Sequence, residues 1–122
     1  MSVKNLEKIR AWAEKVVEDP KIRDLVIGFR RWGIKTTNSC EGHQFGGYPY
    51  PWIRIKLDST LKATRIIGMW NYGVLNNPIK WLIKPAYEPE IMPDNKVYLV
   101  PEGGIASLEW LQEEAQKFGK WL

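Results

Sequence analysis

Cysteine and histidine are almost missing from the chain, which has one residue of each among 122. The single thiol, that of Cys40, cannot form an intrachain disulfide bond, which excludes the small secreted domains that disulfides hold together. No apolar run reaches the ~18 residues that a membrane-spanning helix needs. The first residues pass directly into a charged pattern, without a secretory signal. We therefore expect a cytoplasmic protein with no membrane partner.

The composition is that of an ordinary globular chain, with 44% hydrophobic and 26% charged residues. Its length fits one domain, so we expect a single domain over residues 1–122. Lysine and arginine number 18 against 14 aspartates and glutamates, for a net charge of +4. This excess is compatible with an anionic partner without demonstrating one. Abundant lysine, glutamate and isoleucine hint at a thermophilic source.

Hydrophobic periodicity predicts four helices and four strands in the order α-α-β-β-α-β-β-α. Asp19 as N-cap and Pro20 at the first helical position mark the start of the second helix. Strand pairs separated by a helix favour an α+β fold with a mainly antiparallel four-stranded sheet. The expected helices cover about 3–18, 20–32, 60–72 and 105–122, and the expected strands cover 34–38, 51–57, 79–84 and 96–100.

The densest group of small polar and reactive side chains lies at residues 36–43, which contain the only cysteine and the only histidine. The run leaves a predicted strand and enters a glycine-rich turn, where outward-pointing backbone N–H groups can bind an anion. Hydroxyl groups in the run would add further hydrogen-bond donors. The candidate ligand-binding residues here are Thr36, Thr37, Asn38, Ser39 and Gly42.

Three interpretations of Cys40 and His43 stay open: a catalytic pair, a metal site and a purely structural role. Cys40 as nucleophile and His43 as base form a pair if residues 40–43 make a tight turn, but not if they are extended. The same two residues could bind metal, completed by a carboxylate such as Glu41 or by a second chain. Alternatively, Cys40 is a small buried hydrophobe within ordinary turn hydrogen bonds. We take Cys40, Glu41 and His43 as candidate catalytic residues and assign no metal site or cofactor.

The strand that follows alternates with period two. Ile53, Ile55 and Leu57 fall on one face, which is expected to be buried. The other face is a column of aromatic residues leading into two cations, formed by Tyr50, Trp52, Arg54 and Lys56. Such a face can stack bases while neutralising phosphate, as single-strand RNA binders do. In the alternative, helices cover both faces, so that Trp52 is core and the cations extend to solvent.

Tryptophan is abundant, with seven residues. Trp12, Trp32 and Trp70 fall at or beside the apolar stripes of their helices and are predicted to lie in the core. Trp110 and Trp121 sit together on the last helix, more than about 100° from its apolar stripe. This pair predicts a second contact, made either with the chain's own N-terminal helix or with another subunit, as in a homo-oligomer.

Residues 36–43, followed by Pro51 and Trp52, resemble a group of small uncharacterised microbial proteins with a Ser-Cys-x-Gly-His…Pro-Trp pattern. The same run is similar to the Thr-Thr-Ser-Ser-Cys-Ser-Gly-Arg signature of the wybutosine-synthesising tRNA methyltransferase family, with departures at Asn38, Glu41 and His43. That family acts on a hypermodified guanosine in tRNA with S-adenosylmethionine. The resemblance implies a role related to RNA or nucleotides.

The leading hypothesis from the sequence is a site for an anionic, base-containing ligand, a nucleotide or RNA. Residues 36–43 and the aromatic-cationic column would form it together. The first alternative is a small enzyme that uses Cys40 and His43, as a thiolate–imidazole pair or as metal ligands. The second is an interaction module that self-associates through Trp110 and Trp121.

Overall fold

The computed structural model describes residues 3–45, 48–73, 77–85, 96–102 and 106–122. Four helices and a four-stranded antiparallel sheet follow one another in the order α-α-β-β-α-β-β-α. The predicted α+β class and element order are therefore confirmed. No helix in these ranges is both long and apolar enough to cross a bilayer.

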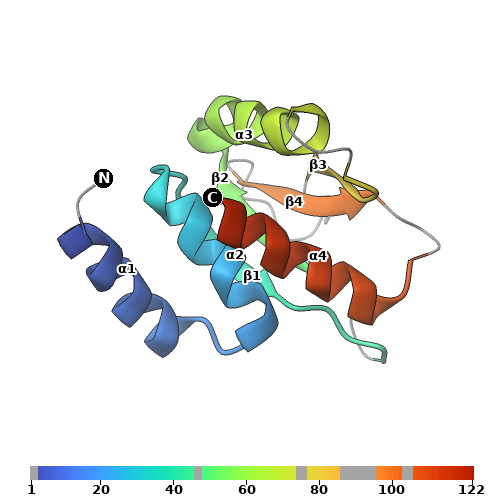
Figure 1. The fold of residues 1–122 in the computed structure, drawn as a ribbon, viewed down its shortest axis with the longest axis horizontal. Coiled ribbons are helices and arrows are strands. Elements are labelled where there is room, and N and C mark those ends of the chain that lie inside the picture. Colours follow the sequence, from blue (N-terminus) through green and yellow to red (C-terminus); the bar gives the residue numbers. More distant parts are fainter. Residues whose placement is uncertain (1–2, 46–47, 74–76, 86–95, 103–105) are drawn as a thin grey trace.

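The helices are α1 (Val3–Val16), α2 (Pro20–Arg31), α3 (Thr60–Tyr72) and α4 (Leu108–Trp121). Figure 1 shows α2 between α1 and α4, with α3 above them in this view. α4 begins later than its periodicity predicted because Ser107 caps it, accepting the Trp110 N–H at 3.1 Å. Asp19 occupies the predicted N-cap position of α2, but its side chain makes no capping hydrogen bond.

The strands are β1 (Thr36–Cys40), β2 (Trp52–Lys56), β3 (Lys80–Pro85) and β4 (Lys96–Glu102), in the spatial order β1-β2-β4-β3. β1 extends further along the chain than predicted, so Ser39 and Cys40 belong to the strand rather than to the turn. Leu57, predicted on the buried face of β2, is instead 49% exposed. The strand ends at Lys56, and a 3-10 turn, η1 (Leu57–Ser59), redirects the chain at that point.

β1 carries a bulge. Its register against β2 shifts between Thr36 and Asn38, which leaves Thr37 without a residue opposite it. An extra residue of this kind moves the later side chains of a strand to the other side of the sheet. Beyond the bulge, Cys40 lies opposite Trp52.

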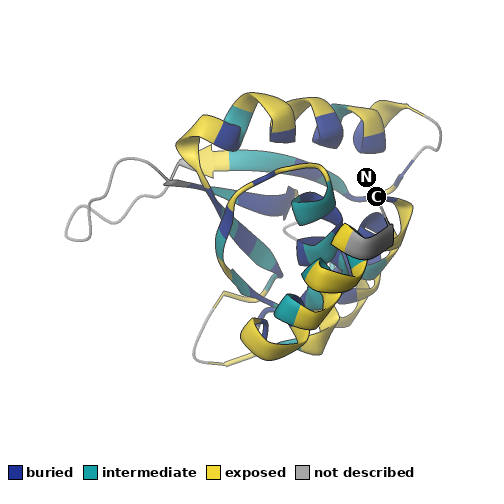
Figure 2. Ribbon diagram, turned by 90° about the vertical axis from the view of Figure 1, so that its left-hand side faces the viewer, coloured by how far each residue is buried: buried dark blue, intermediate teal, exposed yellow. Residues whose placement is uncertain are grey.

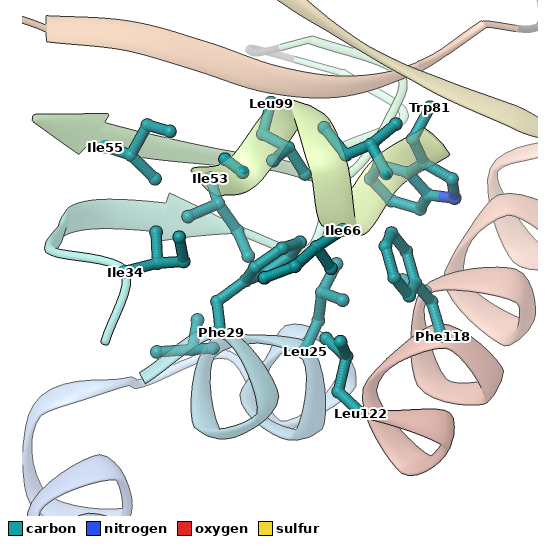
Figure 3. Close-up of a cluster of buried hydrophobic side chains, with 14 of the residues drawn as sticks. Leu25, Phe29, Ile34, Ile53, Ile55, Ile66, Trp81, Leu99, Phe118 and Leu122 are labelled. Atoms are coloured by element: carbon teal, nitrogen blue, oxygen red, sulfur yellow. The ribbon is translucent and has the colours of Figure 1, made fainter. Parts of the chain in front are cut away.

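All four helices contribute to one apolar core against one face of the sheet. The members labelled in Figure 3 are Leu25, Phe29, Ile34, Ile53, Ile55, Ile66, Trp81, Leu99, Phe118 and Leu122. Figure 2 shows the helices above and to the right of the sheet, and none of the described helices on its left. The sheet is therefore packed on one side. We call the side away from this core the open face.

The alternation predicted along β2 is confirmed over the length of the strand. Ile53 and Ile55 are buried in the core. Trp52 and Arg54 are half-buried and Lys56 is exposed, so these three residues belong to the open face.

α4 lies directly on the backbone of α2 at Gly119. A Cβ atom at this position would collide with the backbone of Asp24 and Leu25. Any side chain would therefore push the two helices apart. The contact continues toward the start of α2, where the Lys21 ammonium donates to the side-chain oxygen of Gln112 at 3.2 Å.

Candidate functional site

The loop after β1 brings three chemically active side chains together. The carboxylate of Asp19, the thiol of Cys40 and the imidazole of His43 each offer one ligand atom, and these atoms all lie within 4.8 Å of one another. Cys40 is buried, Asp19 is half-buried and His43 is exposed. The cluster therefore combines the two residues that the sequence singled out with a third that it assigned only to helix capping. We call it the Asp19–Cys40–His43 cluster.

Gly42 makes the turn that brings His43 back to Cys40. Its φ is +93°, a left-handed conformation that residues with a side chain rarely adopt. A Cβ atom there would also lie 2.8 Å from the carbonyl carbon of Tyr50. The Gly42 N–H donates to the Cys40 sulfur at 3.4 Å, and the His43 N–H donates to the Tyr48 carbonyl at 2.9 Å. Gly42, predicted as a ligand-binding residue, thus shapes the loop and already uses its own N–H.

Asp19 and Glu41 form hydrogen bonds that differ from those suggested by the sequence. The carboxylate of Asp19 accepts the backbone N–H of Glu41 at 3.0 Å. The carboxylate of Glu41 accepts the N–H of Lys21 at 3.3 Å, so an acid from the loop satisfies a donor at the start of α2. The Glu41 carbonyl accepts from the Gln112 side chain at 3.0 Å. The described contacts of Glu41 therefore join the loop to α2 and α4, and the Asp19 carboxylate faces Cys40 instead.

Burial raises the pKa of the Cys40 thiol, the Gly42 N–H opposes this shift, and the negative charges of Asp19 and Glu41 add to it. Because the thiolate is the reactive nucleophile, a raised pKa leaves little of the reactive form at neutral pH. The thiolate–imidazole interpretation therefore starts from an unfavourable protonation state.

A cavity of about 350 Å³ lies between α1, α2 and β1. Its wall includes Trp12, Arg30 and the predicted residues Thr36, Thr37, Asn38 and Ser39. The Arg30 guanidinium lies 4.3 Å from the centre of the Trp12 ring. It donates to the Thr36 hydroxyl at 2.7 Å and to the Thr36 carbonyl at 2.6 Å. The Thr36 hydroxyl, predicted as a phosphate donor, is thus already bonded to a cation of the protein.

One cross-strand row on the open face runs over all four strands. Asn38 lies opposite Arg54, Arg54 lies opposite Tyr98, and Tyr98 lies opposite Lys84. Residues directly opposite one another share a face of the sheet, so an amide, a guanidinium, a phenol and an ammonium stand in line. The Arg54 Nε donates to the Thr37 hydroxyl at 3.1 Å, which holds the guanidinium in place.

Aromatic rings accompany this row. Trp52 meets Tyr98 edge to face, with ring centroids 5.3 Å apart. Tyr50 stacks on Tyr48 with centroids 5.4 Å apart. Burial raises the pKa of Tyr50, and the neighbouring phenols of Tyr48 and Tyr98 raise it further. Tyr50 and Trp52, both predicted from the sequence, therefore lie beside a third aromatic residue, Tyr98, that completes the surface.

The remaining tryptophans differ in their surroundings. Trp70 is buried and Trp12 half-buried, but Trp32 is 50% exposed, so its predicted core position was wrong. Trp32 is the C-cap residue of α2, where the chain leaves the packed helix. Trp121 contacts Trp70 of α3, with ring centroids 5.3 Å apart, and Trp110 and Trp121 remain 41% and 39% exposed. The contact described for Trp121 is thus made with α3, a partner that the prediction did not name, and self-association stays a prediction.

The predicted site residues form neighbouring groups rather than one cavity. Thr36, Thr37, Asn38 and Ser39 border the cavity beside α1, Cys40 and His43 meet Asp19, and the aromatic-cationic column lies on the open face. The pairing of Cys40 with Trp52 joins the last two groups across β1 and β2. Comparison with protein-family models, curated proteins and solved structures finds no match to the chain.

Proposed function

We propose that this protein binds an anionic, base-containing ligand, single-stranded RNA or a nucleotide, on the open face of its sheet. The observation that carries the proposal is the row Asn38–Arg54–Tyr98–Lys84, which crosses all four strands on the side away from the core. Trp52 stands against Tyr98 beside that row.

The row supplies both interactions that a nucleotide needs. Aromatic side chains stack on any base, because every base has a π-face. Lysine and arginine neutralise phosphate and release its counterions. Neighbouring strands lie about 4.8 Å apart, so Arg54 and Lys84 are carried by strands about 10 Å apart, with Tyr98 on the strand between them. A base over Tyr98 would therefore have a cation on either side.

The cations are the groups that we expect phosphate to meet first. The hydroxyls of Thr36 and Thr37 are bonded to the guanidinium groups of Arg30 and Arg54, respectively. Lys56 and Lys84 are exposed. The similarity of residues 36–42 to a tRNA-modifying family points toward the same class of ligand.

Fluorescence titration of the full chain tests the proposal with three ligands: a single-stranded RNA, its duplex and a mixture of nucleotides. We expect the single strand to change tryptophan fluorescence and to bind more weakly as salt is raised. The duplex should bind less well, because its bases are not accessible for stacking. If RNA and nucleotides change neither tryptophan fluorescence nor the melting temperature, the proposal is wrong.

Arg54→Gln provides the matched variant. It should weaken binding and lower the slope of log affinity against log salt by about 1. Arg65→Gln is its control, because Arg65 is an exposed arginine on α3. Equal effects of the two substitutions would show that binding follows net charge rather than the open face.

A further inference from the structure

The Asp19–Cys40–His43 cluster has the dimensions of a metal site. A tetrahedral zinc ion with bonds of about 2.0–2.3 Å holds its ligand atoms about 3.5 Å apart. The three atoms here lie within 4.8 Å of one another, so binding of an ion would draw them somewhat closer together. The three residues come from the start of α2, the end of β1 and the loop that follows.

The backbone around each ligand is fixed by contacts that the ion is not needed to explain. The Asp19 carboxylate accepts the N–H of Glu41 at 3.0 Å. Cys40 is the last paired residue of β1. The N–H of His43 donates to the carbonyl of Tyr48 at 2.9 Å. The cluster is therefore preorganised by a strand end, a helix start and a backbone hydrogen bond of His43.

The orientation of Asp19 agrees with this grouping. An aspartate at an N-cap position ordinarily accepts a backbone N–H of its own helix. Asp19 makes no such bond, and Glu41 from the loop accepts the Lys21 N–H instead. The Asp19 carboxylate instead accepts the Glu41 N–H and lies beside the Cys40 thiol, so that both side chains can face an ion at the end of β1.

We propose that Asp19, Cys40 and His43 bind a divalent transition metal, with zinc as the best fit. Thiolate and imidazole ligands select zinc-class ions over magnesium and calcium, which prefer oxygen ligands alone. A thiolate, a carboxylate and a neutral imidazole balance the charge of the dication. Three protein ligands leave a fourth position for water or for a bound molecule, as in open zinc sites. The exposure of His43 gives that position access to solvent.

Cobalt(II) alone, added to the metal-free full chain, is the direct probe. The wild-type protein should bind one equivalent and show the absorption of a cobalt–thiolate bond, and zinc should displace the cobalt. Cys40→Ser should abolish that absorption, and Asp19→Asn and His43→Gln should each weaken binding by about a hundredfold or more, since each ligand carries a large share of a metal site's affinity. Glu18→Gln is the matched control. It removes the neighbouring carboxylate and should leave binding unchanged.

Alkylation of the wild-type thiol gives a second measurement that does not depend on a variant folding. Zinc should protect Cys40 from iodoacetamide, and a chelator should restore labelling. The proposal is overturned if the folded wild-type protein binds neither cobalt nor zinc at micromolar free metal, or if Cys40→Ser leaves binding intact. Rapid labelling at neutral pH that zinc does not slow would also overturn it, in favour of a thiolate–imidazole pair.

Discussion

The two faces of the sheet share the same strands but differ in how far their side chains are buried. On the packed face, Ile53 and Ile55 of β2 are buried beneath helices. On the open face, the residues between and beside them, Trp52, Arg54 and Lys56, retain access to solvent. Because side chains alternate along a strand, a single substitution in β2 changes one face and leaves the other in place. We therefore expect fold stability and the proposed ligand binding to be separable by mutation, and the predictions below test that separation.

The largest effect is expected in the core that covers the packed face, at Phe118 of α4. Its ring contacts Phe29, Trp70 and Trp81, with centroids 5.4, 4.8 and 5.6 Å apart. Phe118→Ala should lower the free energy of unfolding by about 3–5 kcal/mol, because it leaves a cavity in the core. Urea unfolding measures the loss. A change below about 1 kcal/mol, typical of an ordinary substitution, would contradict the described packing.

On the open face, Trp52→Ala should act mainly on binding. Loss of one stacking ring is expected to cost about 1–3 kcal/mol of RNA binding free energy. The free energy of unfolding should fall by less than in Phe118→Ala, because Trp52 is only half-buried. Trp110→Ala on α4 is the control, as it removes a partly exposed indole elsewhere. Equal losses of RNA affinity in the two variants would erase the distinction between the faces.

A smaller effect is expected at Lys84, the last member of the open-face row. Lys84→Gln should reduce the salt slope of RNA binding by about 1 and weaken binding uniformly across sequences. Its effect on unfolding should stay within about 0.5 kcal/mol, since the side chain is exposed. Lys120→Gln, an exposed lysine of α4, serves for comparison. If it lowered the slope equally, the cation's position on the sheet would not matter.

The smallest effect belongs to neither face. Lys35 bonds to Asp58 at 2.9 Å and lowers the pKa of that carboxyl from its ordinary value of 3.8. Folding lowers the pKa of Asp58, so its charged carboxylate stabilises the fold at pH values above the ordinary pKa. This contribution is lost as the pH falls through the lowered pKa of the folded state. Both side chains are exposed, so salt should screen the effect. Melting curves of wild type and Asp58→Asn should therefore converge in acid and in high salt. A gap that persists at low pH would assign the effect to another cause.

The sequence was sufficient for the fold class and element order because the buried stripes are strongly periodic. The ends of the strands are harder to predict from the sequence. β1 is composed of small polar residues, whose hydrophobic alternation is too weak to define its ends, so the sequence predicts a turn at its final two residues. Trp32 shows a related limit. It continues the apolar spacing of α2, but the chain has already left the helix at that point.

Only the part of the candidate site that is local in sequence could be predicted. Cys40 and His43 are close in sequence, so the sequence alone allows a turn that brings them together. Asp19 is separated from them by the whole of α2, and an aspartate before a proline is most simply explained as a helix cap. Only the packing of α2 beside β1 brings the Asp19 carboxylate close to the Cys40 thiol. Tyr98 was assigned to the right strand, but its place opposite Arg54 depends on a register that the sequence does not encode locally.

The bulge at Thr37 makes the number of residues in β1 more consequential than their identity. In a regular strand, residues four apart project from the same side, yet Thr36 lies opposite Ile55 of the packed face and Cys40 lies opposite Trp52 of the open face. The one inserted residue, Thr37, decides the face of the sheet to which the later side chains of β1 point. A chain shortened by a single position here would keep almost every side chain and still turn its only thiol inward. Conversely, substitutions along β1 leave that face unchanged as long as the spacing between Thr36 and Cys40 is kept.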